Sequence, residues 1–317
     1  YKQLKVYGSF LLNENMIMYR DNTNLIGTAS VTFDSKGKQL RALFINGPSV
    51  SLSSPLTLTS QLNCSSGVFT TNNHDVSTGN YFNIYVTQNA TMTLNLGTSS
   101  ITTDYQFVTH GNSYNSSYGS LIMNNSQATY LFNGQYFYSY SDEIPWERII
   151  TNRSYNDIIR FERYGDIGSL IQKGNAKIEL NQTYRNNGGP HGNNLTKIGY
   201  AEIKNSANFT GNVSFTTLKL QGNGAIYTFG SNYSYSVSET FELGQAGCAI
   251  TTLKSNSPGT AANISSVQSL TSNYLDIQDI NYTGTASFTA NNSINNGNNS
   301  GITFGLLQER NLYWIGE

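Results

Sequence analysis

Apolar and polar residues alternate along most of this chain, starting at its first residues. The opening run has an apolar residue or glycine at every second position, namely Leu4, Val6, Gly8, Phe10 and Leu12. A β-strand turns successive side chains to opposite faces, so one edge of this segment is apolar and needs a groove to occupy. The groove belongs either to the same chain, which makes the segment an internal strand, or to a neighbouring molecule.

Short alternating runs separated by turn residues continue along the chain. They cover residues 27–33, 39–45, 49–62, 81–86, 91–96, 101–108, 175–184, 198–203, 213–220, 225–229, 234–243, 280–289 and 302–307. Asn133-Gly134 lies between two aromatic-rich runs and predicts a β-hairpin with a type I′ turn. Closely spaced short strands favour an antiparallel fold. We therefore predict an all-β protein, an antiparallel β-sandwich of the immunoglobulin or pilin type, in one sandwich or two, preceded by an extended strand.

The domain organisation follows from the same pattern. With 317 residues the chain is long enough for one large domain or two ordinary ones. Residues 1–20 form the predicted tail and residues 21–317 the globular region. Charge is concentrated in residues 142–166, and an Asn-Gly loop covers residues 186–194. A boundary near 141–155 or near 190 is compatible with these features, and the sequence does not choose between them.

The composition excludes several classes of function. Only 12% of the residues are charged, against about 25% in an average soluble protein, and the net charge is −1. Nucleic-acid binding requires a basic face, which this chain does not offer. No stretch is apolar enough for a membrane-spanning helix. Because the chain begins with Tyr rather than Met, we expect a secreted, extracellular protein whose leader peptide has been removed.

Motifs that carry chemistry are scarce. No nucleophile elbow, phosphate loop or calcium loop is found, and the three His residues are not at metal-ligand spacing. We therefore predict no enzymatic activity, no metal and no cofactor. Two strand-borne carboxylates such as Glu179 and Glu202 remain candidates to flank a sugar, because a glycosidase pair has no spacing signature.

The two cysteines, Cys64 and Cys248, are far apart in sequence. Their spacing matches no zinc or redox motif. In an oxidising compartment we predict a disulfide between them within one subunit, and two buried free thiols are the alternative.

Triplets of the form Asn-x-Ser/Thr are frequent and predict covalent N-glycans. They begin at Asn63, Asn89, Asn115, Asn124, Asn152, Asn181, Asn194, Asn208, Asn212, Asn232, Asn263, Asn281, Asn291 and Asn298. The first 62 residues contain none of these triplets, so no glycan would block the opening strand from entering a groove.

The alternating first strand, the repeated short strands and the glycosylation triplets together resemble the subunit of the archaeal thread, a glycosylated surface filament of thermoacidophilic archaea. The first strand also resembles the N-terminal extension of bacterial chaperone-usher pilins. The resemblance implies a structural filament subunit that binds identical subunits in a helical homopolymer by donor-strand complementation, with Leu4, Val6, Gly8, Phe10 and Leu12 entering the neighbouring groove. Such a cell-surface filament also implies adhesion to a surface or to another cell.

Two other functions are compatible with the sequence. One is a secreted carbohydrate-binding or carbohydrate-cleaving β-domain, in which residues 4–12 form an internal strand. The other is a surface-layer component. The resemblance favours the filament subunit over both.

Overall fold

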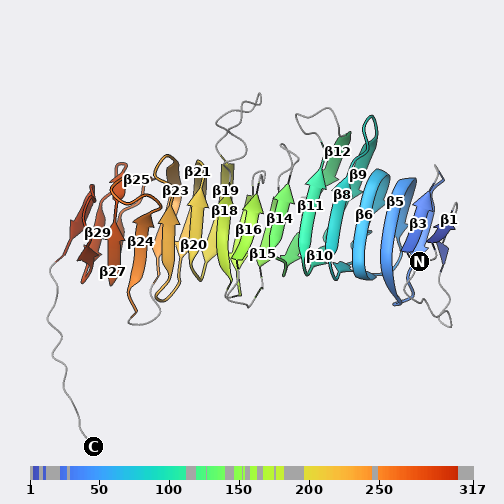
Figure 1. Ribbon diagram of the computed structural model, residues 1–317, viewed down its shortest axis with the longest axis horizontal. Helices are drawn as coiled ribbons and strands as arrows, with labels where there is room; N and C mark the ends of the chain where they lie inside the picture. Colours follow the sequence, from blue (N-terminus) through green and yellow to red (C-terminus); the bar gives the residue numbers. More distant parts are fainter. Residues whose placement is uncertain are drawn as a thin grey trace, which may run out of the picture.

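The protein is a parallel β-solenoid and not the predicted antiparallel sandwich. The structure is a computed structural model that describes residues 3–6, 10–11, 22–26, 29–111, 119–125, 127–139, 146–151, 153, 158–162, 167–174, 176–181, 196–244 and 249–305. Every regular element within these residues is a β-strand, and the strands pair in parallel with those of the next turn. Figure 1 shows the resulting elongated coil, with the sequence running from one end to the other.

Each turn of the coil crosses three faces, here named A, B and C in the order in which the chain meets them. Two long strands, β5 (Gln39–Leu52) and β6 (Leu56–Thr70), bend across all three faces. Face A also contains β1 (Gln3–Val6), β3 (Asn22–Ile26), β8 (Tyr81–Tyr85), β11 (Gln106–His110), β14 (Tyr136–Ser139), β16 (Ile158–Glu162), β18 (Lys177–Asn181), β20 (Ala207–Thr210), β22 (Ile226–Phe229), β24 (Thr251–Ser255), β27 (Leu275–Gln278) and β30 (Ile294–Asn295).

Faces B and C share several strands that turn a corner between them. Face B contains β2 (Phe10–Leu11), β4 (Val31–Asp34), β9 (Thr91–Asn95), β12 (Ser120–Asn124), β25 (Ala262–Ser266) and β28 (Ile280–Thr283). The strands that run from B into C are β15 (Trp146–Thr151), β17 (Ile167–Gln172), β19 (Thr196–Ile203), β21 (Val213–Leu220) and β23 (Ser234–Leu243). Face C also holds β7 (Val76–Thr78), β10 (Ser100–Thr103) and β13 (Thr129–Phe132), and it ends in a separate sheet of β26 (Leu270–Asn273), β29 (Phe288–Asn291) and β31 (Ile302–Phe304).

The core is a set of side-chain stacks that run along the coil axis. Parallel pairing in register places one inward residue of each turn directly against its counterpart in the next, at the strand spacing of about 4.8 Å. The rings of Phe82 and Phe107 are stacked at 4.8 Å, and those of Phe107 and Phe137 at 4.9 Å. Buried apolar residues continue in one cluster from Leu25 to Ala290. Alternation therefore marks the inward side of each strand, as the sequence indicated, but the neighbouring strand comes from the next turn.

The predicted hairpin at Asn133-Gly134 is wrong. The strands on either side, β13 and β14, lie on different faces and pair with β10 and β11 of the preceding turn. Neither Asn133 nor Gly134 has a positive φ angle, which a type I′ turn requires at both positions. A Cβ atom on Gly134 would overlap the carbonyl of Tyr105. The pair forms a corner of the coil, and glycine is needed there because two turns approach closely.

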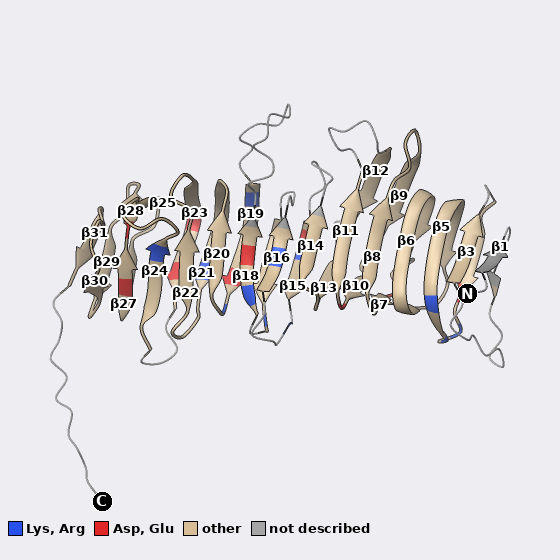
Figure 2. Cartoon of the chain, in the orientation of Figure 1, with Lys and Arg blue, Asp and Glu red and all other residues tan. Residues whose placement is uncertain are grey.

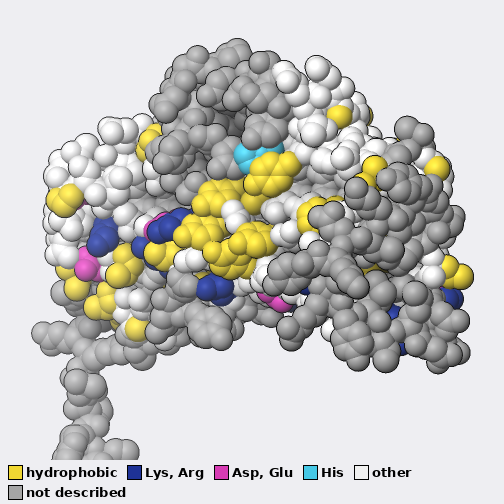
Figure 3. Space-filling model, turned by 45° about the vertical axis from the view of Figure 1, so that its right-hand side comes forward, with side chains coloured by type: hydrophobic (Ala, Val, Ile, Leu, Met, Phe, Trp, Pro, Cys, Tyr) yellow, Lys and Arg dark blue, Asp and Glu magenta, His cyan; other side chains and the backbone are white. Residues whose placement is uncertain are grey.

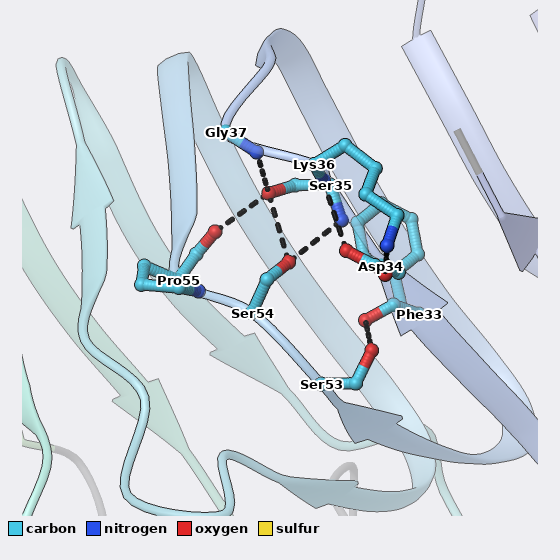
Figure 4. A network of polar contacts seen from close by, with 8 residues as sticks. All are labelled: Phe33, Asp34, Ser35, Lys36, Gly37, Ser53, Ser54 and Pro55. Carbon is cyan, nitrogen blue, oxygen red and sulfur yellow. Dashed lines mark hydrogen bonds and ion pairs between the residues drawn. The ribbon is translucent and has the colours of Figure 1, made fainter. Parts of the chain in front are cut away.

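Side chains at the corners bond successive turns to one another, as the corner after β4 shows (Figure 4). The Ser35 hydroxyl donates to the carbonyl of Pro55 at 2.7 Å, and the Ser35 backbone N–H donates to the Ser54 hydroxyl at 2.9 Å. The Asp34 carboxylate accepts from the backbone N–H of Lys36 and pairs with its ammonium group at 2.8 Å. These contacts with Lys36 lower the pKa of Asp34 to about 2.

Asparagine serves the same purpose, and this role explains its abundance. The Asn124 amide donates to the Asn95 side chain of the turn before, and the Asn281 amide donates to Asn263 in the same way. At other corners the amide oxygen caps a backbone N–H, as Asn212 does for Ser234. Glycosylation was only one interpretation of an Asn-rich sequence, and axial hydrogen bonding accounts for many of these residues.

The hydrogen-bonded columns continue past both positions considered as domain boundaries. Strand β13 pairs with β15 across residues 141–145, and β17 and β18 pair with β19 and β20 across residue 190. The first segments also belong to the coil, because β1 pairs with β3 and β2 pairs with β4. The described segments of the predicted tail, residues 3–6 and 10–11, therefore form the first strands of the solenoid.

Candidate functional site

The outward side of face A, from β3 to β18, carries a distinctive group of half-buried and exposed side chains. We call it the outer A surface. Its residues are Asn24, Ile26, Phe44, Asn46, Asn63, Ser65, Tyr81, Asn83, Tyr85, Tyr105, His110, Tyr136, Tyr138, Arg160 and Glu179. Figure 3 shows hydrophobic side chains gathered in the middle of this view beside a His, with charged side chains next to them. They alternate along the strands with the buried core residues, so one pattern builds both the core and the surface.

Aromatic rings from successive turns touch one another on this surface. The rings of Tyr81 and Tyr105 meet edge to face at 5.3 Å, and Tyr85 is stacked on His110 at 4.5 Å. Tyr85 is 42% exposed and Tyr105 is 41% exposed, so both present ring surface to solvent. Contiguous exposed rings are a common mark of binding surfaces, and tyrosine combines an apolar ring with a polar hydroxyl.

One end of the aromatic cluster is charged. Arg160 lies over the ring of Tyr136 at 5.7 Å, and its Nε atom is 3.0 Å from a carboxylate oxygen of Glu179. The other carboxylate oxygen of Glu179 accepts from the side-chain amide of Asn208 at 3.3 Å. Both charges thus have partners within the protein, and Arg160 holds the Tyr136 ring in place.

The opposite end of the surface is hollowed. A cavity of about 330 Å³ lies over β3, β5 and β6, lined by Asn24, Leu25, Ile26, Phe44, Ile45, Asn46, Asn63 and Ser65. Next to it, the Asn83 amide donates to the Asn63 carbonyl oxygen at 3.1 Å. The Nδ2 atom of Asn63 and the Oδ1 atom of Asn83 are buried and have no hydrogen-bond partner. The hydrogen-bonded pair of amides thus has one unpartnered polar atom on each side. Buried polar atoms are rarely left without a partner.

Charge is nearly absent from the part of the chain that forms the β5 and β6 side of the hollow and carries Tyr81 and Tyr85. Between Arg41 and Asp104 the sequence has one charged residue, Asp75. Figure 2 shows β6 to β11 without colour for charge, while most coloured side chains lie from β14 to β27. This part of the outer A surface is therefore suited to a neutral ligand.

The predicted donor-strand residues lie at the start of the coil. Leu4 and Val6 are in β1, opposite Thr23 and Leu25 of β3, and Phe10 in β2 is opposite Phe33. Gly8 and Leu12 lie outside the described residues. These strands pair within their own chain, as expected of internal strands.

The predicted disulfide has no support at its described end. Cys64 is a free thiol on the inward side of β6, and burial raises its pKa. Cys248 lies outside the described residues. The strand nearest to it in the sequence is β24. This strand is eight strand steps from β6 along face A, roughly 38 Å at the usual spacing. Cys64 matches the alternative of a buried free thiol.

The glycosylation triplets fall into three groups. Asn89, Asn124, Asn232, Asn263 and Asn298 are exposed, and Asn63, Asn208, Asn212, Asn281 and Asn291 are half-buried. The triplets at Asn115, Asn152 and Asn194, and the side chain of Asn181, lie outside the described residues. A glycan is joined through Nδ2, and at Asn63 that atom is buried. The exposed group remains available for the predicted modification.

The two carboxylates considered as a glycosidase pair do not meet. Glu179 is on face A, whereas Glu202 is on the C side of β19 and accepts a 2.7 Å hydrogen bond from the Tyr200 hydroxyl. Lys204 lies 2.8 Å from the other oxygen of Glu202. Hydrogen bonds from Lys204 and Tyr200 lower the pKa of Glu202, and burial together with Glu202 raises the pKa of Tyr200 to about 12. These groups form a surface hydrogen-bond network instead of an acid and base across a sugar.

Within the described residues, no group of three or more His, Cys, Asp and Glu side chains could hold a metal ion. The same residues contain no helix of the length and hydropathy needed to cross a bilayer. Comparison of the chain with protein families, with curated proteins and with solved structures found no match.

The tyrosine cluster was not predicted as a site. Its signal was present, because Tyr81 and Tyr85 lie four residues apart in one alternating run and Tyr136 and Tyr138 two apart in another. The outward side of these strands is thus rich in aromatic residues, where a polar side would be expected. An antiparallel sandwich offered no reason to place the two runs together, since that requires the solenoid register.

Proposed function

We propose that this chain is an extracellular carbohydrate-binding β-solenoid, and that the outer A surface binds a neutral glycan. The observation that carries the proposal is the exposed tyrosine cluster, which begins on a part of face A with almost no charge. A sugar ring has an apolar C–H face that can lie on an aromatic ring, and its hydroxyl groups require polar partners. Gln61 in β6 and Gln106 in β11 lie opposite Tyr81, and Asn83 lies between Tyr81 and Tyr85 in β8, so these three side chains supply them.

The extended form of face A favours a chain of sugars over a single one. The hollow, the two amides and the tyrosines follow one another along the coil axis from β3 to β14. Binding sites generally combine an apolar lining with a few polar groups that fix orientation, and this surface has both. Tyrosine suits such contacts because few rotatable bonds are immobilised on binding.

The filament subunit remains a prediction, but the antiparallel sandwich on which its donor-strand mechanism was based is not the observed fold. Donor-strand complementation requires a sandwich that lacks one strand. Here the opening strands β1 and β2 pair with β3 and β4 of the same chain. The alternative of a carbohydrate-binding domain with an internal first strand is compatible with this arrangement, and the exposed tyrosines favour it.

The test is binding of the purified chain to immobilised neutral polysaccharides, followed by calorimetric titration with a soluble oligosaccharide of the type that binds. Tyr85→Ala and Tyr105→Ala should each weaken binding by roughly 2- to 12-fold, the equivalent of about 0.5–1.5 kcal/mol for one aromatic contact. Neither residue belongs to the buried core, because Tyr85 is 42% exposed and Tyr105 is 41% exposed.

Ile226→Ala is the matched control. Ile226 is 43% exposed and begins β22, beyond Glu179 on the same face, so its truncation should leave the affinity unchanged. Absence of binding to all neutral glycans would contradict the proposal, and so would tyrosine variants that bind as well as the unaltered protein.

A further inference from the structure

We infer that the hollow over β3, β5 and β6 is a subsite for the acetamido group of a 2-acetamido sugar. The inference rests on the proposed function and specifies which glycan the outer A surface prefers. Three properties of the hollow carry it: an unsatisfied donor, a neighbouring acceptor and an apolar wall.

The donor is the Nδ2 atom of Asn63. The Oδ1 atom of the same amide is engaged by Asn83 on the next turn, so the planar amide directs Nδ2 away from Asn83 and toward the Phe44 side. That side is the hollow, which Phe44 and Asn63 both line. Nδ2 is buried without a partner, so the side chains that cover it must shift slightly before a ligand oxygen can accept from it. That hydrogen bond would remove an unfavourable feature of the unbound protein.

The acceptor is the hydroxyl of Ser65, two residues further along β6 on the same outward side. It donates its own hydrogen to the Ile45 carbonyl at 3.2 Å, which leaves its lone pairs to accept a hydrogen bond. Ser65 also lines the hollow. The N–H of an acetamido group that places its carbonyl oxygen near Asn63 can donate to this hydroxyl.

The wall is formed by Ile26 and Phe44, which lie on the outward side of adjacent strands. It fits the methyl group of the acetamido substituent. A volume of about 330 Å³ is at the lower end of ligand sites, enough for one sugar unit.

Other substituents match the hollow less well. A hydroxyl group could accept from Asn63 but would leave the apolar wall uncovered. A carboxylate matches it less well, because every described residue that lines the hollow is uncharged. The acetamido group alone among these uses the donor, the acceptor and the wall together.

The experiment compares two hexasaccharides with the same β-1,4 linkage, one of N-acetylglucosamine and one of glucose, by calorimetric titration. They differ at C2, where the first has an acetamido group and the second a hydroxyl. The unaltered protein should bind the acetamido hexasaccharide about tenfold more tightly, which corresponds to about 1.4 kcal/mol.

Asn63→Asp tests the donor directly. It keeps an oxygen for Asn83 and replaces the N–H groups of Nδ2 by an acceptor, so the preference should fall to less than about threefold. Asn95→Asp is the matched control, because Asn95 in β9 on face B also accepts from the asparagine of the next turn, so the change adds the same charge away from the hollow and leaves Asn63 unchanged. Its preference should remain. Phe44→Leu removes the aromatic ring from the apolar wall and should also reduce the preference. It takes the place of Asn63→Asp if the Asn63→Asp variant does not fold.

The outcomes separate the two proposals. Equal affinity for both hexasaccharides, with binding still dependent on Tyr85 and Tyr105, would overturn the acetamido subsite and leave the carbohydrate-binding function intact. A preference that survives both Asn63→Asp and Phe44→Leu would overturn the assignment to this hollow. Binding of neither hexasaccharide nor any other neutral glycan would overturn the proposed function and the subsite with it.

Discussion

Two buried tyrosines on consecutive strands of the chain allow the contribution of corner hydrogen bonds to stability to be measured. Tyr227 in β22 accepts from the backbone N–H of Gly222 at 2.8 Å and donates to the Ile203 carbonyl at 3.2 Å. Tyr235 in β23 accepts from the N–H of Gly230 at 2.9 Å and donates to the Phe209 carbonyl at 2.8 Å. Each hydroxyl thus links the backbone N–H of a corner glycine five residues earlier in the chain to a backbone carbonyl of an earlier turn.

The two sites differ in what remains when the hydroxyl is removed. After Tyr235→Phe, the Gly230 N–H still donates to the Phe209 carbonyl at 3.0 Å, so neither group loses its last partner. After Tyr227→Phe, the Ile203 carbonyl keeps its bond from the N–H of Gln221, but the described residues offer no second acceptor for the Gly222 N–H. Gly222 is buried, so water does not replace the lost partner.

Tyr227→Phe should therefore lower the free energy of unfolding by about 1–3 kcal/mol, the cost of a buried unsatisfied donor. Tyr235→Phe should lower it by about 0.5–1.5 kcal/mol, the net value of one hydrogen bond. The assay is guanidinium unfolding near pH 7, where the Tyr227 phenol is protonated because burial raises its pKa to about 12. Both residues lie in the same turn, so they report on the same region even if the coil unfolds in segments. A larger loss for Tyr235→Phe than for Tyr227→Phe would refute the reasoning.

Four other predictions follow from described contacts. Because the folded state lowers the pKa of Asp34 from 3.8 to about 2, its contribution to stability should be present above pH 3.8 and be lost as the pH falls toward about 2; Asp34→Asn should flatten this part of the stability profile, and an unchanged profile would contradict the assignment. Gly134→Ala should cost about 1–3 kcal/mol in guanidinium unfolding, since its Cβ would overlap a backbone carbonyl of the preceding turn, and a change below about 0.5 kcal/mol would contradict the corner geometry. Cys64 should not react with a thiol reagent in the native protein and should react after denaturation, whereas a peptide map that joins it to the other cysteine would restore the disulfide. In an N-glycosylating host, site-resolved mass spectrometry should find Asn232 occupied and Asn63 unoccupied, and substantial occupancy at Asn63 would show that its amide is accessible.

The strands could be predicted from the sequence, but their partners could not. Alternation located β8, β9, β21 and β23 nearly to the residue, because inward residues are apolar in a solenoid as in a sandwich. Strand direction is determined at the corners. Asn133-Gly134 has the composition of a tight hairpin, and only the close approach of Tyr105 from another turn makes it a corner.

The repeat itself was hidden by loops of unequal length. Side-chain hydrogen bonds between neighbouring turns join residues 20 apart at Asn63 and Asn83 and 29 apart at Asn95 and Asn124. No single period therefore appears in the sequence, although such a period is the usual sign of a solenoid. The outer A surface could not be assembled without that register, because its residues come from many turns.

Because the strands pair in parallel register, the distance between two surface groups along the coil axis depends on the number of turns between them and not on the number of residues. Chain segments of different length separate Tyr81 from Gln106 and Gln106 from Tyr136, yet each step moves the surface forward by one strand spacing of about 4.8 Å. A corner can therefore gain or lose residues without changing the distance between surface groups along the axis. Deletion of a complete turn would instead shorten every such distance across it by the same amount, so evolution can vary the corners freely while the spacing of the bound ligand's contacts stays constant.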